Sequence, residues 1–270
     1  MKAKVLYHKG CNDGFTAAYC AWTVLGDSAE YIGVSYGKQP PTIKEGDRIY
    51  VVDFSYPREL MLSWEKIVSE LVVLDHHKTA QEALQGLSFA TFDMHKSGAV
   101  LAWEYWHPNQ PLPILVQYVQ DRDLWRKELP CSDQVFVMLR SFKKEFEVWD
   151  VLAHLSQDEF LSLAKTIGTP ILGKQRQDVE AISSTYTWQE IGGHKVPTVH
   201  TPKPSLASDI GHYLCKLLPE APFSGISWSD GDGKTKWGLR SIGDFDVSQV
   251  AKQYGGGGHK NAAGFEQFSS

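Results

Sequence analysis

The tripeptide Asp75-His76-His77 follows directly after the apolar run Leu71-Val72-Val73-Leu74. A short run rich in Leu and Val predicts a buried β-strand. In parallel α/β sheets, ligands bind just beyond the carboxyl ends of the strands, which is where this tripeptide would lie. A carboxylate and two imidazoles in that place could bind a divalent cation or position a phosphate.

Two apolar runs further upstream end in the same way. Residues 5–7 are followed by His8 and then Asp13, and residues 49–52 are followed by Asp53. Taken singly, a His after a strand is more often a structural residue, and an Asp is more often a cap or turn former. Three such strand ends close together in the chain favour convergence of these side chains at one edge of a sheet.

A metal site is the chemistry that this convergence indicates. The candidate ligands are His8, Asp13, Asp53, His76 and Asp121. Carboxylate and imidazole ligands without a thiolate suit Mn²⁺ or Mg²⁺, with Co²⁺ or Zn²⁺ as alternatives, and disfavour iron–sulfur or copper centres. Because the set exceeds what one ion needs, it predicts two ions that share a carboxylate and lower the pKa of a water, which could then attack phosphorus.

A second motif lies further along the chain, where Gly255-Gly256-Gly257-Gly258 precedes His259 and Lys260. Consecutive glycines let the backbone approach a ligand closely and direct several N–H groups at an anion. A glycine run alone is equally typical of a flexible linker. The cationic neighbours favour an anion cradle, which Arg240 could assist, although a surface role suits Arg240 equally well.

The order of the predicted elements indicates an α/β protein with two domains. Strand-like and helix-like segments alternate through residues 1–145, which predicts a mostly parallel, doubly wound sheet. Residues 146–190 are helical and charged and predict a linker. Residues 191–270 return to short strands and helices and predict a smaller, mixed α/β domain.

Several element boundaries can be predicted as well. Helices are expected at residues 15–25, 59–69, 97–106, 112–120, 204–218 and 247–253. Ser55 is the expected cap of the second helix and Ser97 that of the third. Residues 224–228 and 236–241 predict a hairpin around Asp230-Gly231-Asp232-Gly233.

Composition excludes several classes of protein. The chain has 32 acidic and 27 basic residues and a net charge of −5, which argues against binding duplex nucleic acid. Cys11, Cys20, Cys131 and Cys215 are scattered and predict neither a disulfide framework nor a structural zinc site. No apolar run is long enough for a membrane span, and the first residues lead straight into a strand. We expect a cytoplasmic protein without a membrane partner.

Five blocks of the sequence together resemble the DHH phosphoesterase superfamily with its associated C-terminal domain. They are His8-Lys9-Gly10-Cys11-Asn12-Asp13-Gly14, Val52-Asp53, Asp75-His76-His77, Asp121-Arg122-Asp123 and the run from Gly255 to Phe265. The resemblance implies a catalytic domain that binds two Mn²⁺-like ions and a smaller domain that holds a phosphate or nucleotide. Members hydrolyse short oligoribonucleotides, linear or cyclic dinucleotides, single-stranded DNA, pyrophosphate or polyphosphate.

The resemblance also implies roles by position. His8 and Asp13 would bind one ion, His76 and Asp121 the other, and Asp53 would bridge them. Relatives commonly have a further Asp in the first block. This chain has Gly10 and Cys11 there instead, so one ion would have one carboxylate fewer.

The remaining roles concern the substrate. His77 would face the scissile phosphate, and Asp75 would orient a histidine. The substrate-binding residues implied for the smaller domain are Arg240, Gly256, Gly257, Gly258 and His259.

The expected function is a Mn²⁺-dependent phosphodiesterase, similar to an exoribonuclease, that hydrolyses short oligoribonucleotides or dinucleotides. Two alternatives stay open: an inorganic pyrophosphatase or polyphosphatase, and a nucleotide-binding protein that has lost hydrolysis, which the missing Asp near Gly10 would explain. The expected partners are the short nucleotide substrate and, as an option, a second copy of the chain in a homodimer.

Overall fold

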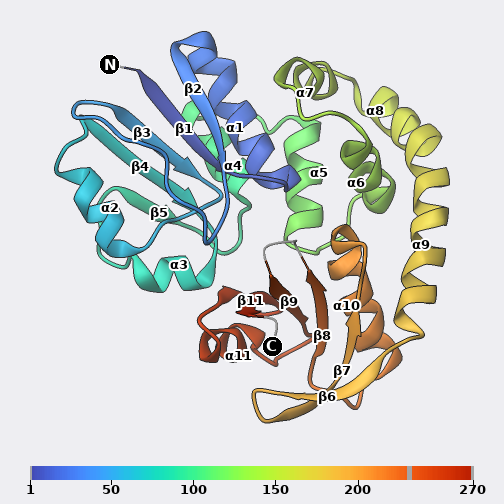
Figure 1. Cartoon of the computed structure of the whole chain (residues 1–270). Helices are drawn as coiled ribbons and strands as arrows, with labels where there is room; N and C mark the ends of the chain where they lie inside the picture. Colours follow the sequence, from blue (N-terminus) through green and yellow to red (C-terminus); the bar gives the residue numbers. More distant parts are fainter. Residues whose placement is uncertain (1, 230–232, 269–270) are drawn as a thin grey trace. The chain divides into compact units, whose positions relative to one another are not determined.

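The computed structural model describes residues 2–229 and 233–268. They form two compact units, which are divided between Leu172 and Gly173 (Figure 1). Each unit contains one β-sheet with helices packed against it, so each is described by itself.

A five-stranded, all-parallel sheet forms the centre of the N-terminal unit, in the order β2-β1-β3-β4-β5. Its strands are β1 (Ala3–His8), β2 (Ala29–Val34), β3 (Arg48–Val52), β4 (Glu70–Asp75) and β5 (Ala90–Phe92). The strand order reverses at β1, since β2 lies on one side of it and β3 on the other. Open α/β sheets bind ligands beyond the carboxyl ends of the strands at such a reversal.

Burial of both sheet faces explains the apolar composition of the strands. In β3, Ile49 and Val51 belong to one core cluster, whereas Tyr50 and Val52 belong to another. Successive side chains of a strand point to opposite faces, so a strand covered on both sides needs an apolar residue at every position. The predicted doubly wound, parallel sheet is therefore confirmed.

Helices cover both faces of this sheet (Figure 1). One face is covered by α1 (Asn12–Leu25), α4 (Gly98–Trp106) and α5 (Ile114–Asp123), and the other by α2 (Arg58–Glu65). The short helix α3 (Lys78–Ala83) follows β4. The helices predicted in these stretches are present, although α2 ends at Glu65 because the chain must turn there to enter β4.

One of the two predicted helix caps, Ser97, is present, and the other, Ser55, is not. Ser97 caps α4 as expected, since its hydroxyl accepts a hydrogen bond from the amide of Val100. Ser55 does not cap α2, which begins after Pro57. The Ser55 hydroxyl instead donates a hydrogen bond to the buried carboxylate of Asp75, which needs donors because it is removed from water.

The segment predicted as a linker contributes to both units. The helices after α5 are α6 (Ser132–Ser141), α7 (Phe146–Ala153), α8 (Gln157–Leu163), the π-helical turn Ala164–Gly168, and α9 (Thr169–Ser183). Trp149 of α7 is fully buried in the core of the N-terminal unit, and its indole N–H donates to the hydroxyl of Thr16, 2.9 Å away on α1. α9 contains the boundary between the two units.

A mixed six-stranded sheet forms the C-terminal unit, in the order β10-β11-β9-β8-β7-β6. Its strands are β6 (Thr187–Ile191), β7 (His194–His200), β8 (Ser224–Ser229), β9 (Lys234–Arg240), β10 (Gly257–His259) and β11 (Ala262–Phe268). β8 and β9 form the predicted antiparallel hairpin, whereas residues 230–232 of its expected turn lie outside the described residues. The predicted mixed α/β fold of this unit is confirmed.

Two helices cover the opposite faces of this second sheet. α10 (Ala207–Leu217), which follows the 3-10 turn Pro204–Leu206, packs with Ile226 of β8, whereas α11 (Val247–Gln253) packs with Leu239 of β9. In the described ranges, no helix has both the length and the apolar character needed to cross a membrane.

If α7 is part of the N-terminal core and not of a mobile linker, Trp149→Ala should lower the free energy of unfolding by about 3–5 kcal/mol, because it leaves a large cavity. Urea denaturation of the full chain measures this loss. Val151→Ala on the same helix is the control: Val151 is 64% exposed, so the change should stay within about 0.5 kcal/mol. Equal stabilities of the two variants would contradict the packing of α7.

Candidate metal centre

Asp53 lies at the meeting point of two groups of ligand atoms. It directly follows β3 and is 2% exposed. Its Oδ2 is 3.1 Å from the Sγ of Cys11 and 3.6 Å from the Nδ1 of His8. Its Oδ1 is 3.1 Å from the Nε2 of His76. The two oxygens of one carboxylate therefore face two different sets of side chains.

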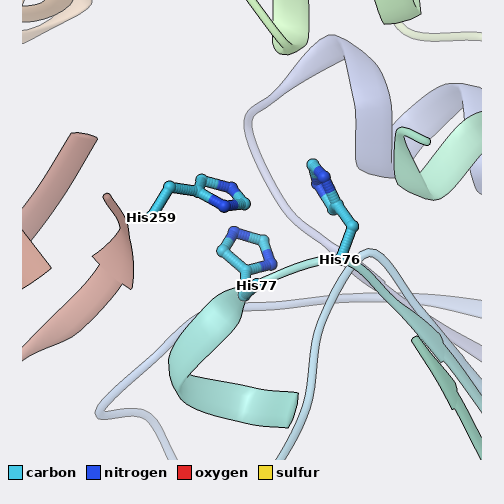
Figure 2. A group of neighbouring side chains, drawn as sticks. All are labelled: His76, His77 and His259. Carbon is cyan, nitrogen blue, oxygen red and sulfur yellow. The ribbon is translucent and has the colours of Figure 1, made fainter. Parts of the chain in front are cut away.

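The second set surrounds the imidazole of His76, which lies in the connection from β4 to α3 (Figure 2). Its Nε2 is 3.6 Å from the Oδ2 of Asp13 in the first turn of α1. It is 3.4 Å from the Oδ2 of Asp123, the last residue of α5. Strand ends and helix ends that are far apart in sequence thus bring three carboxylates to one imidazole.

The charges of these groups shift one another's pKa. Burial lowers the pKa of His76, but the hydrogen bond to Asp53 and the nearby carboxylates raise it, to about 10. Burial and the charges of Asp53 and Asp123 raise the pKa of Asp13 well above its usual range. A cluster that retains protons in this way has an excess of negative charge, which a divalent cation would neutralise. The buried carboxylate and imidazole donors therefore fit a divalent metal ion.

Cys11 shares this environment. Burial and the charge of Asp53 raise the pKa of its thiol well above the usual value, so the thiol keeps its proton and donates a hydrogen bond to the Asp53 carboxylate. The Sγ also accepts a hydrogen bond from the amide of Gly14, 3.1 Å away, and so caps α1.

His77 is hydrogen-bonded to Asp75, a carboxylate outside the group around His76. Its Nδ1 donates to the Oδ1 of Asp75, 2.7 Å away, and Asp75 is fully buried. Burial lowers the pKa of His77, and the carboxylate of Asp75 outweighs this and raises it. The contact fixes the proton on Nδ1 and orients the ring. Figure 2 shows that this ring and that of His76 occupy the same connection after β4.

Two glycines leave the space that the carboxylates occupy. A Cβ on Gly98 would lie 2.4 Å from the Cβ of Asp53, and one on Gly14 would lie 2.3 Å from the carbonyl oxygen of His8 and 3.0 Å from the Oδ2 of Asp53. The amides of Gly98 and Ala99, at the N-terminus of α4, also donate to the Asp13 carboxylate at 2.6 and 3.0 Å. The positive end of this helix therefore stabilises the acid charge.

Four of the five predicted ligands, His8, Asp13, Asp53 and His76, come together at this edge. Asp121 does not: its Oδ1 accepts hydrogen bonds from the amides of Glu128 and Leu129, at 2.9 and 3.4 Å. Asp123 lies beside His76 instead. Residues two apart on a helix point about 200° apart, so only one of these acids can face the sheet edge.

The structure thus favours Asp123 over Asp121 as the ligand from α5. Cys11 and Asp123 are the residues at the site that sequence reasoning did not choose. Cys11 lies in the block from His8 to Gly14, and Asp123 lies in the block from Asp121 to Asp123. Leu115, Tyr118 and Val119 mark the apolar face of α5, but Asp121 and Asp123 flank that face on opposite sides, so the sequence carries no signal that separates them.

The glycine run of the C-terminal unit forms an edge strand. Gly257–His259 pairs antiparallel with Ala262–Gly264 as β10. A Cβ on Gly256 would lie 2.0 Å from the carbonyl oxygen of Gly264, so this glycine permits the close approach of β11. A paired strand argues against the flexible-linker alternative.

Arg240 and His259 lie on the same face of this second sheet. His259 pairs with Ala262, and Ala262 pairs with Arg240, so the three side chains are neighbours across β10, β11 and β9. The Arg240 guanidinium donates to the hydroxyl of Ser208, 2.7 Å away. The small side chain of Ala262 lies between the two basic residues in this row.

If Gly98 makes room for Asp53, Gly98→Ala should displace that carboxylate and weaken Mn²⁺ binding about 10–100-fold, as supporting residues of metal sites commonly do. Isothermal titration of the purified chain measures the affinity. Gly173→Ala is the matched control, because Gly173 is an exposed helical residue with open space at its Cβ. Unchanged Mn²⁺ affinity in Gly98→Ala would contradict the steric role.

Thermal denaturation with and without Mn²⁺ can show whether Asp121 or Asp123 of α5 is the metal ligand. An ion that binds only the folded chain stabilises it by about 2.7 kcal/mol at 100 times its Kd. Asp123→Asn should lose most of this Mn²⁺-dependent rise in Tm. Asp121→Asn should keep the rise but start from a lower Tm, because its amide contacts weaken. The reverse pattern would restore Asp121 as the ligand.

The sequence matches a known domain family and a viral protein. Residues 207–267 match the DHHA1 domain. The chain is 28% identical over 281 residues to an uncharacterized protein, R106, of Acanthamoeba polyphaga mimivirus. The match covers 96% of this chain, and the chain spans only 66% of that relative's length.

Three solved structures are similar over nearly the whole chain. The DHH domain of a member of a family of ribosomal proteins has a TM-score of 0.60 at 12% identity, covering 99% of this chain and 83% of that one. An exopolyphosphatase-related protein from Bacteroides fragilis has a TM-score of 0.52 at 12% identity, and the match covers 99% of this chain and 87% of that one. The pGpG-specific phosphodiesterase PggH from Vibrio cholerae has a TM-score of 0.50 at 15% identity, and the match covers 98% of this chain and 93% of that one.

These identities establish the fold and not the substrate. The resemblance seen in the sequence is confirmed: residues 207–267, in the C-terminal unit, match the DHHA1 domain, and the fold is similar to that of a solved DHH domain and of two related structures.

Proposed function

We propose that this protein is a metal-dependent phosphodiesterase that hydrolyses short nucleotides, either oligoribonucleotides or dinucleotides. The observation that carries the proposal is the position of Asp53, whose two oxygens face two separate groups of ligand atoms. Such a carboxylate can bridge two divalent ions. The fold shared with a phosphodiesterase named for a dinucleotide, pGpG, supports this substrate class.

The ion-binding residues would be His8, Asp13, Asp53, His76 and Asp123. Bound divalent ions, which we expect to include Mn²⁺, would lower the pKa of a water molecule and neutralise charge on the phosphate oxygens. Asp123 is the only exposed acid of this set, with 30% of its side chain accessible, so it leaves the cluster open to solvent.

His77 would act on the substrate. Because Asp75 holds its Nδ1, the other ring nitrogen would bind a phosphate oxygen or donate a proton to the leaving group. The raised pKa of His77 favours the protonated form that this role needs. In the C-terminal unit, Arg240 and His259 would bind a phosphate group, with Gly256, Gly257 and Gly258 shaping the backbone beside them.

A pyrophosphatase or polyphosphatase is the second candidate, because the fold is also shared with an exopolyphosphatase-related protein. Either reaction uses the same ions and the same attack on phosphorus. The two differ in the group that leaves and in the length of substrate that is bound, so a comparison of substrates separates them.

The proposal predicts that the purified chain with Mn²⁺ cleaves di- to pentaribonucleotides or a dinucleotide faster than pyrophosphate or polyphosphate. Asp53→Ala should reduce the rate on the order of 1,000-fold, since it removes the bridging ligand. Phosphate release and chromatography of the products measure these rates.

Asp27→Ala controls for the loss of an acid, because Asp27 is exposed and outside the cluster; it should behave as the unaltered chain. Faster cleavage of pyrophosphate would favour the alternative. Fewer than one tightly bound Mn²⁺ per chain, together with no turnover of any substrate, would instead indicate a nucleotide-binding protein that has lost hydrolysis.

A further inference from the structure

Cys11 is the member of the cluster to which the proposed function assigns no role. Its Sγ is 3.6 Å from the Nδ1 of His8 and 3.1 Å from the Oδ2 of Asp53. The three ligand atoms lie within 4.8 Å of one another. This spacing would let one cation contact the sulfur, the nitrogen and the oxygen together.

The backbone holds the sulfur in place. Cys11 occupies the position before α1, and the amide of Gly14 donates to its Sγ. Lys144 fixes the same turn, since its Nζ donates to the carbonyl oxygen of Cys11 at 3.0 Å and to the Oδ1 of Asn12 at 2.7 Å. The side chain therefore needs little rearrangement to bind a cation beside Asp53.

Helix capping alone does not account for a cysteine here. Ser, Thr, Asp and Asn are the preferred residues before a helix, and Cys is not among them. A Ser would accept the same amide hydrogen bond from Gly14 and would bring no thiol next to a buried carboxylate. What Cys adds at this position is a soft sulfur ligand.

We propose that Cys11 is a metal ligand and that the two ion sites differ chemically. Thiolate ligands favour Zn²⁺ or Co²⁺, whereas carboxylates favour Mn²⁺ or Mg²⁺. His8, Cys11 and Asp53 would select the softer ion, while Asp13, His76 and Asp123 would keep the harder one. On binding, the Cys11 thiol releases its proton to solvent as the sulfur–metal bond forms.

The inference rests on the proposed function only in that both need divalent ions at this sheet edge. The test titrates the metal-free full chain with Co²⁺ and records the near-ultraviolet absorption that arises from charge transfer between a thiolate and Co²⁺. The parent should develop this band. Cys11→Ser and Cys11→Asp should lack it, whereas Cys131→Ser should retain it, because Cys131 is a similarly half-buried cysteine outside the cluster.

Competition between Zn²⁺ and Mn²⁺ gives a second readout. The preference for Zn²⁺ should fall about tenfold or more in Cys11→Asp, which keeps a ligand but replaces sulfur by oxygen. A parent that binds Co²⁺ without a Cys11-dependent band, and with an unchanged Zn²⁺ preference in Cys11→Asp, would overturn the inference while leaving the proposed function intact. A Cys11-dependent band in a chain that hydrolyses no phosphoester would uphold the inference and overturn the function.

Discussion

The repulsion among Asp13, Asp53 and Asp123 is the constraint that the surroundings of this sheet edge must offset. Two of these acids are almost fully buried, and burial of an unpaired charge is strongly unfavourable. The surroundings offset it with donors from several elements: the first amides of α4 for Asp13, and an imidazole and a thiol for Asp53. These donors reduce the excess charge without removing it, as the raised pKa of His76 shows.

Sheet topology explains why the acids meet at all. The reversal of strand order at β1 opens the carboxyl edge between β1 and β3. His8 ends β1, and Asp53 directly follows β3. Because β4 is the parallel neighbour of β3, its end brings His76 to the same edge. The core beneath is apolar on both faces, so the polar chemistry is confined to the rim.

The sequence predicted the features that local periodicity determines. Buried strands appear as continuous apolar runs, and their last residues locate the edge, so His8, Asp53 and His76 could be placed together. The choice between Asp121 and Asp123 depends on the rotation of α5 against the sheet, which only tertiary packing sets. The role of α7 likewise depends on a distant pairing, between Trp149 and Thr16. A run of glycines has no side-chain pattern, so pairing of β10 with β11 could not be foreseen.

The backbone at Asp53 has a consequence for how this chain can vary. Its φ is 51°, in the left-handed region that Gly, Asn and Asp enter far more readily than other residues. Of these three, only Asp carries a carboxylate. Glu could also supply a carboxylate, but Glu enters the left-handed backbone region less readily than Asp does. Conformation and charge therefore restrict the same site independently, and an exchange of Asp53 for Glu is disfavoured by the backbone conformation.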